Sequence, residues 1–228
     1  MTPESRLDAK HLLLIGAGPG VGAAVARRFG REGFRATLIS RGGAAEQVAA
    51  GLRDEGMSMS PLVSDVGDLD GFRASLHELY DAPDAPGVLV YNASALVPDG
   101  ILTSTVEHLR ETYDVDVIGA VVAAQIAAPV MRAAGSGTIL FTGGGFADVP
   151  IPAFATISMG KAALRAAATM IAADVGGDGV HAASITIVGQ VAPGTPFDPN
   201  NIAEVFWTAH THGPEQWLAE YRFEPTAG

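Results

Sequence analysis

The sequence predicts an α/β protein in which a three-layer, doubly wound parallel sheet forms a single domain over residues 1–228. Short apolar runs, typical of strands buried on both faces, alternate with longer helical stretches. The connections are turns, and none is long enough to be a domain linker. The chain is 48% hydrophobic and rich in Ala and Gly, so its helices can pack closely against a sheet.

The first half of the chain contains three predicted strand–helix units. Its strands are short apolar runs, and the first helix follows a glycine-rich turn and ends at Gly33. The third helix is amphipathic, because its leucines and Phe72 recur at helical spacing. In chain order we expect strand Leu12–Ile15, helix Val21–Arg31, strand Phe34–Ser40, helix Ala44–Glu55, strand Ser60–Ser64 and helix Asp68–Tyr80.

The second half repeats the alternation with longer helices. Two of these are Ala-rich, and Asn200 is a candidate cap for the last one. We expect right-handed crossovers between the parallel strands. In chain order the predicted elements are strand Gly87–Tyr91, helix Val106–Ala133, strand Gly137–Thr142, helix Ala153–Val175, strand Val180–Val188, helix Asn201–Thr211 and a small final strand at Tyr221–Phe223.

Composition excludes several classes of function. The net charge of −11 opposes binding to nucleic acid and to anionic membranes. It fits an acidic cytoplasmic protein or, alternatively, one that takes a cationic substrate. The absence of Cys rules out disulfides and thiolate chemistry. Residues 1–10 contain no apolar signal region, and the apolar stretch Gly119–Met131 is too short to span a bilayer.

A glycine-rich turn joins the first predicted strand to the first helix. It contains Gly16, Gly18, Gly20 and Gly22, with Val21 between the last two. Such a turn needs backbone angles that side chains disfavour, and missing Cβ atoms let a pyrophosphate approach the chain. The N–H groups at the start of the helix then face the phosphates. The strand–turn–helix context indicates a dinucleotide site rather than a purely structural turn.

The spacing of these glycines resembles the cofactor loop of the short-chain dehydrogenase/reductase superfamily, which has a Rossmann fold. The resemblance extends from Leu12 to about Ile187. Ser40 replaces the acidic residue that binds the ribose of NAD in the family, and Arg41 can pair with the 2′-phosphate of NADP. We therefore expect NADP(H) rather than NAD(H). The resemblance also implies cofactor contacts from two further pairs, Asp65–Val66 and Asn92–Ala93.

The same resemblance implies an altered catalytic centre. Lys161 matches the family's lysine, which binds the nicotinamide ribose, but the tyrosine position four residues earlier is Ile157. Gly144 stands at the serine position and Asp116 at the asparagine position. We expect Asp116 to form a salt bridge with Lys161, directly or through water, and to hold it charged. Thr142 is the hydroxyl next to Gly144 and is the third catalytic candidate.

Other polar groups are candidates to replace the tyrosine. Each is more often structural in such a position, but all are expected near the carboxyl ends of the strands. They are Tyr91, Ser94, Thr142, Thr156, Ser158 and Asp148. The connection before Asn201 is too short for the family's usual substrate loop, so the site is either open or closed by the tail with Phe206, Trp207 and Trp217.

Three functions remain open. The first is NADP(H)-dependent hydride transfer on a small carbonyl, imine or enone with rearranged proton transfer, which needs no tyrosine if the substrate is already an iminium cation. The second is a non-redox cyclase or isomerase that uses Asp116 or Asp148. The third is a cofactor-binding pseudoenzyme. The resemblance also implies a homodimer or homotetramer built on the two long helices. The sequence contains no signal that names the substrate.

Overall fold

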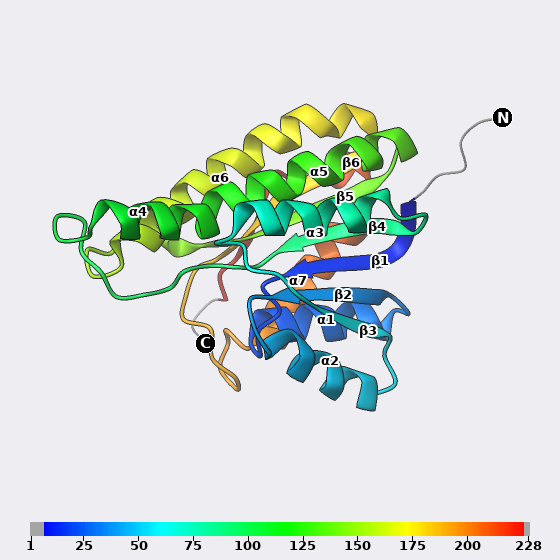
Figure 1. The fold of residues 1–228 in the computed structure, drawn as a ribbon, viewed down its shortest axis with the longest axis horizontal. Helices are drawn as coiled ribbons and strands as arrows, with labels where there is room; N and C mark the ends of the chain where they lie inside the picture. Colours follow the sequence, from blue (N-terminus) through cyan, green and yellow to red (C-terminus); the bar gives the residue numbers. More distant parts are fainter. Residues whose placement is uncertain (1–6, 226–228) are drawn as a thin grey trace.

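The computed structural model describes residues 7–225, which form a seven-stranded parallel sheet covered by helices on both faces (Figure 1). The strand order is β3-β2-β1-β4-β5-β6-β7, and all six pairings are parallel. The predicted doubly wound fold is confirmed. The prediction for the start of the chain falls partly on residues 1–6, which lie outside the described residues.

The elements follow the predicted order with small shifts of their ends. The strands are β1 Leu7–Ile15, β2 Arg35–Ser40, β3 Met59–Val63, β4 Ala85–Tyr91, β5 Gly137–Gly144, β6 Val180–Ile187 and β7 Glu220–Phe223. The helices are α1 Val21–Arg31, α2 Ala44–Asp54, α3 Leu69–Asp81, α4 Val106–Tyr113, α5 Gly119–Ala134, α6 Ala155–Val175 and α7 Pro199–Thr211. The small final strand is therefore confirmed, paired with β6.

The strand order reverses direction between β1 and β4. Ile15 at the end of β1 lies opposite both Ile39 of β2 and Tyr91 of β4, so three strands end at the same level. The chains that leave them diverge to opposite faces of the sheet. A crevice forms at such a switch point, which is where open α/β sheets bind ligands.

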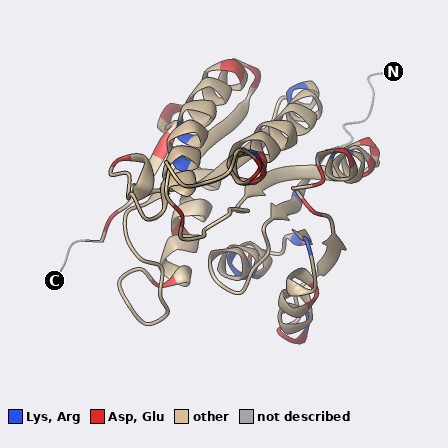
Figure 2. Ribbon diagram, turned by 60° about the vertical axis from the view of Figure 1, so that its left-hand side comes forward, with Lys and Arg blue, Asp and Glu red and all other residues tan. Residues whose placement is uncertain are grey.

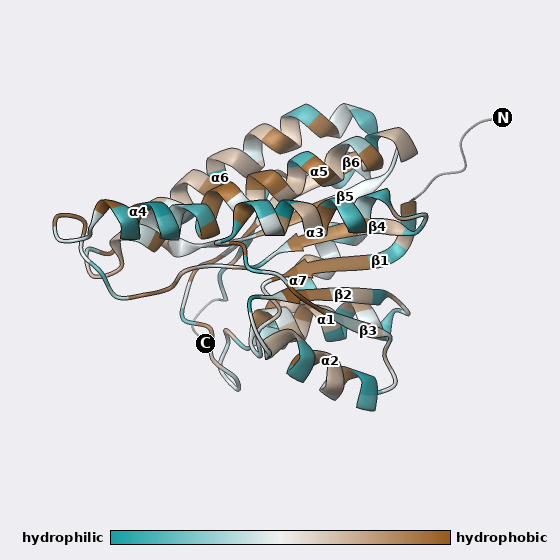
Figure 3. Cartoon of the chain, viewed as in Figure 1, coloured by the Kyte–Doolittle hydropathy of each residue, from teal (hydrophilic) through white to brown (hydrophobic). Residues whose placement is uncertain are grey.

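Each face of the sheet has its own apolar core. Leu12 and Leu14 of β1 point to the side of α1, α2 and α7, whereas Leu13 and Ile15 point to the side of α3, α5 and α6. Figure 3 shows the hydrophobic colour concentrated on the central strands, with hydrophilic patches on the outer helices. Because β1 is buried on both sides, it positions the turn that follows it rigidly.

The predicted helix Val106–Ala133 is continuous but irregular. A π turn, Asp114–Ile118, joins α4 to α5. The whole stretch Val106–Ala134 is long and apolar enough to cross a membrane by length and composition alone. Core helices of soluble proteins meet the same test, and here α5 packs against the sheet, so this is weak evidence for a membrane span.

One prediction about the last helix is wrong. Asp198, not Asn200, caps α7, because its carboxylate accepts the N–H of Asn200. The tail aromatics do not close the crevice. Phe206 is fully buried in the core, Trp207 packs edge-on against Phe29, and Trp217 stacks on His181 at the start of β6, at the opposite end of the sheet from the crevice.

Candidate cofactor crevice and catalytic centre

The glycine-rich turn has the backbone geometry that the sequence predicts. Gly16 has a φ of +89°, and a Cβ there would collide with the backbone of Ala93. A Cβ on Gly22 would lie 2.7 Å from the carbonyl oxygen of Gly16, so α1 can approach β1 only with glycine here. At Gly18 and Gly20, by contrast, a Cβ would meet nothing within 4 Å. These two glycines border open space rather than protein.

The start of α1 is free to bind an anion. Gly20 is its N-cap, and no side chain caps it. The first turn contains no acidic residue. Free N–H groups and the positive end of the helix dipole therefore face the open space beside Gly18 and Gly20. This geometry fits a pyrophosphate group.

Asn92 ties this turn to the centre of the sheet. Its side-chain amide donates to the carbonyl of Gly16 at 2.8 Å, and its oxygen accepts the hydroxyl of Thr142 at 2.9 Å. The side chain thereby bridges β1, β4 and β5 at their carboxyl ends. Asn92 therefore braces this edge of the sheet beside the glycine-rich turn.

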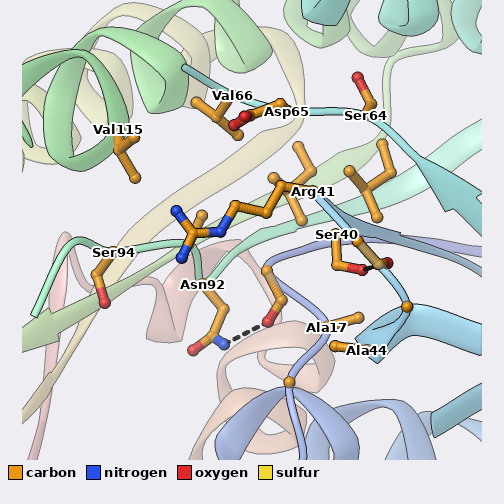
Figure 4. Close-up of a pocket in the computed structure, with 17 residues that line it drawn as sticks. Ala17, Ser40, Arg41, Ala44, Ser64, Asp65, Val66, Asn92, Ser94 and Val115 are labelled. Atoms are coloured by element: carbon orange, nitrogen blue, oxygen red, sulfur yellow. Dashed lines mark hydrogen bonds between the residues drawn. The ribbon is translucent and has the colours of Figure 1, made fainter. Parts of the chain in front are cut away.

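A pocket of about 420 Å³ opens at the crevice (Figure 4). It brings together most of the predicted cofactor residues from the ends of β1 to β4. These are Gly16, Gly18, Ser40, Arg41, Asp65, Val66, Asn92 and Ala93. Gly20, Val21, Gly22 and Lys161 do not line it. Gly20, Val21 and Gly22 form the start of α1, and Lys161 lies deeper along the crevice on α6.

Ser40 and Arg41 have different roles in this pocket. The hydroxyl of Ser40 accepts the N–H of Ala45 and donates to the carbonyl of Gly42, so it shapes the turn into α2. The exposed guanidinium of Arg41 extends across the pocket (Figure 4) and forms no ion pair with residues 7–225. An unpaired cation beside a position without a carboxylate suits a phosphate group.

On the other side of the pocket, Asp65 and Val66 follow β3. The Asp65 carboxylate accepts the N–H of Gly67 at 2.9 Å, which fixes the turn. Val66 is buried and contacts the position where Gly119 begins α5. This wall is a backbone turn with an apolar side chain, which suits a flat heterocycle.

Lys161 lies at the deep end of the crevice. Its side chain is 7% exposed, and its ammonium donates to the backbone carbonyl of Thr142 at 2.7 Å. The hydroxyl of Thr142 points to Asn92 instead. Thr142 therefore positions both Lys161 and Asn92, through two different atoms.

The π turn brings Asp116 against α6. Its side chain is 1% exposed, one oxygen accepts the N–H of Ala95 at 2.8 Å, and the other has no partner. Gly160 makes this approach possible, because a Cβ there would lie 2.7 Å from the Cβ of Asp116. Within residues 7–225 the two charged groups form no direct salt bridge, so the water-mediated contact stays a prediction.

Burial shifts both groups toward their neutral forms. It lowers the pKa of Lys161, although the nearby Asp116 carboxylate acts in the opposite direction. Burial also raises the pKa of Asp116, against the effects of the Ala95 N–H and of Lys161. The attraction of Asp116 thus favours the charged form of Lys161, as expected, but burial has the larger effect on the pKa of Lys161.

The positions of the family's two hydroxyls are apolar. Ile157 is 1% exposed, and Gly144 faces the stem of Lys161 and the ring of Phe146. Four of the hydroxyls proposed as replacements already donate their hydrogens to internal acceptors: Tyr91 to Val115, Thr142 to Asn92, Thr156 to Asp99 and Ser158 to Phe154. Among the candidate hydroxyls in residues 7–225, only that of Ser94 is exposed and has no internal acceptor, and it lies on the pocket wall.

Asp148 is bound to two arginines. Its carboxylate accepts from Arg222 at 2.9 Å and from Arg165 at 2.5 Å. These hydrogen bonds, that of Arg222 first, lower the pKa of Asp148. A carboxylate held in this way stays ionised and is a poor general acid.

The sequence analysis missed Asp99, which organises the entrance of the site. One carboxylate oxygen accepts the N–H groups of Ala155 and Thr156, and the other accepts the Thr156 hydroxyl and contacts His108 at 3.1 Å. Asp99 thus caps α6 from a distant loop. No signal in the sequence identifies it, because the cap lies 56 residues away from the helix that it caps.

The charged residues elsewhere are mainly acidic, as the net charge of −11 requires. In the view of Figure 2, acidic residues occupy helix ends and loops, and the Lys and Arg side chains are scattered among them. Among the described residues, no group of three or more His, Asp or Glu has the arrangement of a metal site.

Residues 10–196 match the model of the short-chain dehydrogenase family. The chain belongs to this family. It is 32% identical over 125 residues to meso-2,3-butanediol dehydrogenase from Serratia marcescens, a match over 54% of this chain and 49% of that protein. The chain thus aligns with about half to two thirds of the length of several curated relatives, including the human dehydrogenase/reductase SDR family member 4.

Solved structures are similar over more of the chain. A short-chain dehydrogenase from Rhodopseudomonas palustris has a TM-score of 0.84 and 26% identity, covering 97% of this chain and 99% of that one. A gluconate 5-dehydrogenase from Burkholderia cenocepacia, in complex with NADP and tartrate, has a TM-score of 0.72 and 26% identity, covering 80% and 72%. The family and fold implied by the sequence resemblance are confirmed.

Proposed function

We propose that the chain is an NADP(H)-dependent oxidoreductase that transfers hydride between the nicotinamide and a small organic carbonyl, imine or enone without a catalytic tyrosine. The observation that carries this proposal is the single pocket at the switch point, which gathers eight of the predicted cofactor residues. The NADP complex of the gluconate 5-dehydrogenase supports the choice of cofactor. When bound, the reduced nicotinamide supplies a hydride.

Different residues of the chain bind different parts of the cofactor. The start of α1 with Gly18, Gly20, Val21 and Gly22 holds the pyrophosphate, and Arg41 pairs with the 2′-phosphate. Another group, from the ends of β3 and β4, surrounds the adenosine half: Asp65, Val66, Asn92 and Ala93. Lys161 binds the nicotinamide ribose through the N–H bonds that Thr142 leaves free.

Lys161 and Asp116 also manage protons at the reaction end. The unpartnered oxygen of Asp116 is buried beside the helix that carries Lys161. A proton held by this pair can pass to the cleft through the ammonium of Lys161. Thr142 is a positioning residue, since its carbonyl holds the ammonium and its hydroxyl is committed to Asn92.

The cofactor assignment is tested by calorimetric titration with NADPH and NADH. Replacing Arg41 with Ala removes a charge-assisted contact of about 1.5–3 kcal/mol, so NADPH affinity should fall by about 10- to 100-fold. NADH affinity should stay unchanged. Arg73→Ala is the matched control, because Arg73 is an exposed arginine of α3 outside the pocket. Full NADPH affinity in Arg41→Ala refutes the assignment.

A cofactor-binding pseudoenzyme is the second candidate. The observation that favours it is the internal use of the hydroxyls around the cleft, which leaves the catalytic end poor in proton donors. NADPH binding without oxidation by any carbonyl, imine or enone identifies this function. For the non-redox cyclase or isomerase, Asp116 remains as the acid/base candidate, because Asp148 is bound to two arginines.

The quaternary structure and location remain predictions. A groove of about 310 Å³ lies between α5 and α6, and Met170 beside it is 66% exposed. A homodimer or homotetramer that pairs these helices buries this surface. Light scattering that gives the mass of a monomer contradicts it. We also propose a cytoplasmic location, with no nucleic-acid or membrane partner.

A further inference from the structure

The reaction end of the crevice has few hydrogen-bond donors for a substrate oxygen. The nearest hydroxyls, those of Thr142, Thr156 and Ser158, all donate to internal acceptors. Lys161 already donates to the carbonyl of Thr142, and Gly144 has no side chain. A carbonyl group that accepts hydride becomes an alkoxide, which needs a donor at once. Among the described hydroxyls named above, only that of Ser94 on the pocket wall has no internal acceptor.

Two aromatic rings flank the same end of the crevice. Phe146 follows the glycine triplet, and its ring lies 3.9 Å from the position that a Cβ on Gly144 would occupy. The ring of Phe154, at the start of α6, has its centroid 6.0 Å from that of Phe146. Both side chains are half-buried. Aromatic faces attract cations, but unlike hydroxyl groups they have no proton to donate.

Electrostatics on this side of the site also favours a positive ligand. Asp99 carries the negative charge here: burial raises its pKa, but hydrogen bonds from Thr156 and His108 outweigh this and lower it. Asp116 contributes less, because burial raises its pKa. Lys161 is the cation of the floor, and its ammonium is withdrawn to the Thr142 carbonyl. A substrate that brings its own positive charge needs no additional donor.

We propose that the hydride acceptor is a preformed iminium ion, an organic C=N⁺ group that lies against the exposed faces of Phe146 and Phe154 beside Gly144. This inference rests on the proposed function and narrows its substrate class. The iminium carbon accepts hydride from a reduced nicotinamide and forms a C–H bond. The π electron pair of C=N⁺ becomes the lone pair of a neutral amine, and the nicotinamide is oxidised. No proton is transferred in this step.

The experiment compares two bicyclic substrates of similar size with NADPH. One is N-methyl-3,4-dihydroisoquinolinium, a permanent iminium, and the other is 1-tetralone, a ketone. Because general acid catalysis contributes on the order of 100-fold or more, we expect the iminium to be reduced at least about 100-fold faster. Its single-turnover rate should be the same in H₂O and D₂O. Equal or faster reduction of the ketone overturns the inference and leaves the proposed function in place.

Binding supplies a readout that does not depend on turnover. The probe is 2,2-dimethyl-1,2,3,4-tetrahydroisoquinolinium, a cation that cannot be reduced, and its neutral isostere is 2,2-dimethyltetralin. Cation–π attraction should make the cation bind about 5- to 30-fold more tightly in calorimetry. Phe146→Leu and Phe154→Leu should each remove most of this preference. Phe223→Leu is the control, because Phe223 belongs to a similar aromatic pair with Phe197, 5.8 Å between centroids.

The outcomes separate the two proposals. Preference for the cation, lost in Phe146→Leu and kept in Phe223→Leu, supports the iminium site. Equal binding of cation and isostere overturns it. If NADPH binds but neither substrate is reduced, both the iminium site and the oxidoreductase fail and the pseudoenzyme stands. If NADPH itself does not bind, the cofactor assignment is wrong and both proposals fail with it.

Discussion

Replacing Gly160 with alanine inserts a methyl group between α6 and the π turn that carries Asp116. The new Cβ would lie 2.7 Å from the Cβ of Asp116 and 3.0 Å from its unpartnered oxygen. Carbon atoms pack at about 3.5–4.0 Å, so the side chain or the helix must move by roughly 1 Å. The contact involves a buried side chain on one side and helix backbone on the other. Neither has free space to move into.

Overpacking of this kind costs about 1–3 kcal/mol. Alanine also favours a helix over glycine by about 1 kcal/mol, which offsets part of this cost. Gly51 of α2 separates the two effects, because it is exposed and a Cβ there meets nothing within 4 Å. Gly51→Ala should therefore stabilise the fold by about 0.5–1 kcal/mol. Gly160→Ala should be about 1–3 kcal/mol less stable than Gly51→Ala.

Urea denaturation of the two variants measures this difference directly. For a chain of this length, each kcal/mol also moves the melting temperature by roughly 2–4 °C. Displacing Asp116 weakens the effect that raises the pKa of Lys161, so that pKa should fall further in Gly160→Ala. If Gly160→Ala gains as much stability as Gly51→Ala, the close packing of Asp116 on α6 is refuted.

Three further predictions concern buried polar groups. The Tyr80 hydroxyl is buried without a partner, whereas the Tyr91 hydroxyl donates to a carbonyl. In urea denaturation, Tyr80→Phe should therefore stabilise the fold and Tyr91→Phe should destabilise it, each by about 1 kcal/mol. Equal losses of stability in the two variants contradict this. Burial, aided by nearby His181, lowers the pKa of His210 to about 4. Between pH 6.5 and 4 only the imidazole of the unfolded chain takes up a proton, so the free energy of unfolding should fall by up to about 3 kcal/mol as the pH is lowered. An unchanged acid titration in His210→Gln opposes this. Asp99→Ala should lose about 2–3 kcal/mol in thermal or urea unfolding, and a neutral result removes its capping role.

The fold was predictable because its signals are local and repeated. Strands such as β1 and β4 are apolar runs that need burial on both faces, and only helices on both sides of a parallel sheet satisfy them. The glycine turn was equally clear, because its glycines follow a buried strand and open a helix. Ends of elements were less certain: Asp198 and Asn200 are both good caps, and only the chain's path into α7 selects Asp198.

The catalytic centre was predictable in its residues but not in its contacts. Lys161, Thr142 and Asp116 lie near one another as the family spacing implies, yet the ammonium of Lys161 binds a backbone carbonyl and not a carboxylate. The π turn has no composition signal, because it adds one residue to an otherwise helical run. It determines where Asp116 points. Asp99 was missed for a related reason, since its partners come together only in the folded chain.

The π turn also explains why the hydroxyl of Tyr91 is unavailable. A π turn shifts the helical hydrogen-bond pattern, and the carbonyl of Val115 within it accepts the phenol hydrogen of Tyr91. The same turn carries Asp116 to Gly160. The π turn thus occupies the hydroxyl of Tyr91 on β4 with an internal hydrogen bond and buries the carboxylate of Asp116 near Lys161. Because both effects reduce the donors available at the open face of Gly144, the geometry of the central helix itself disfavours reactions that produce an alkoxide and favours an acceptor that arrives with its charge.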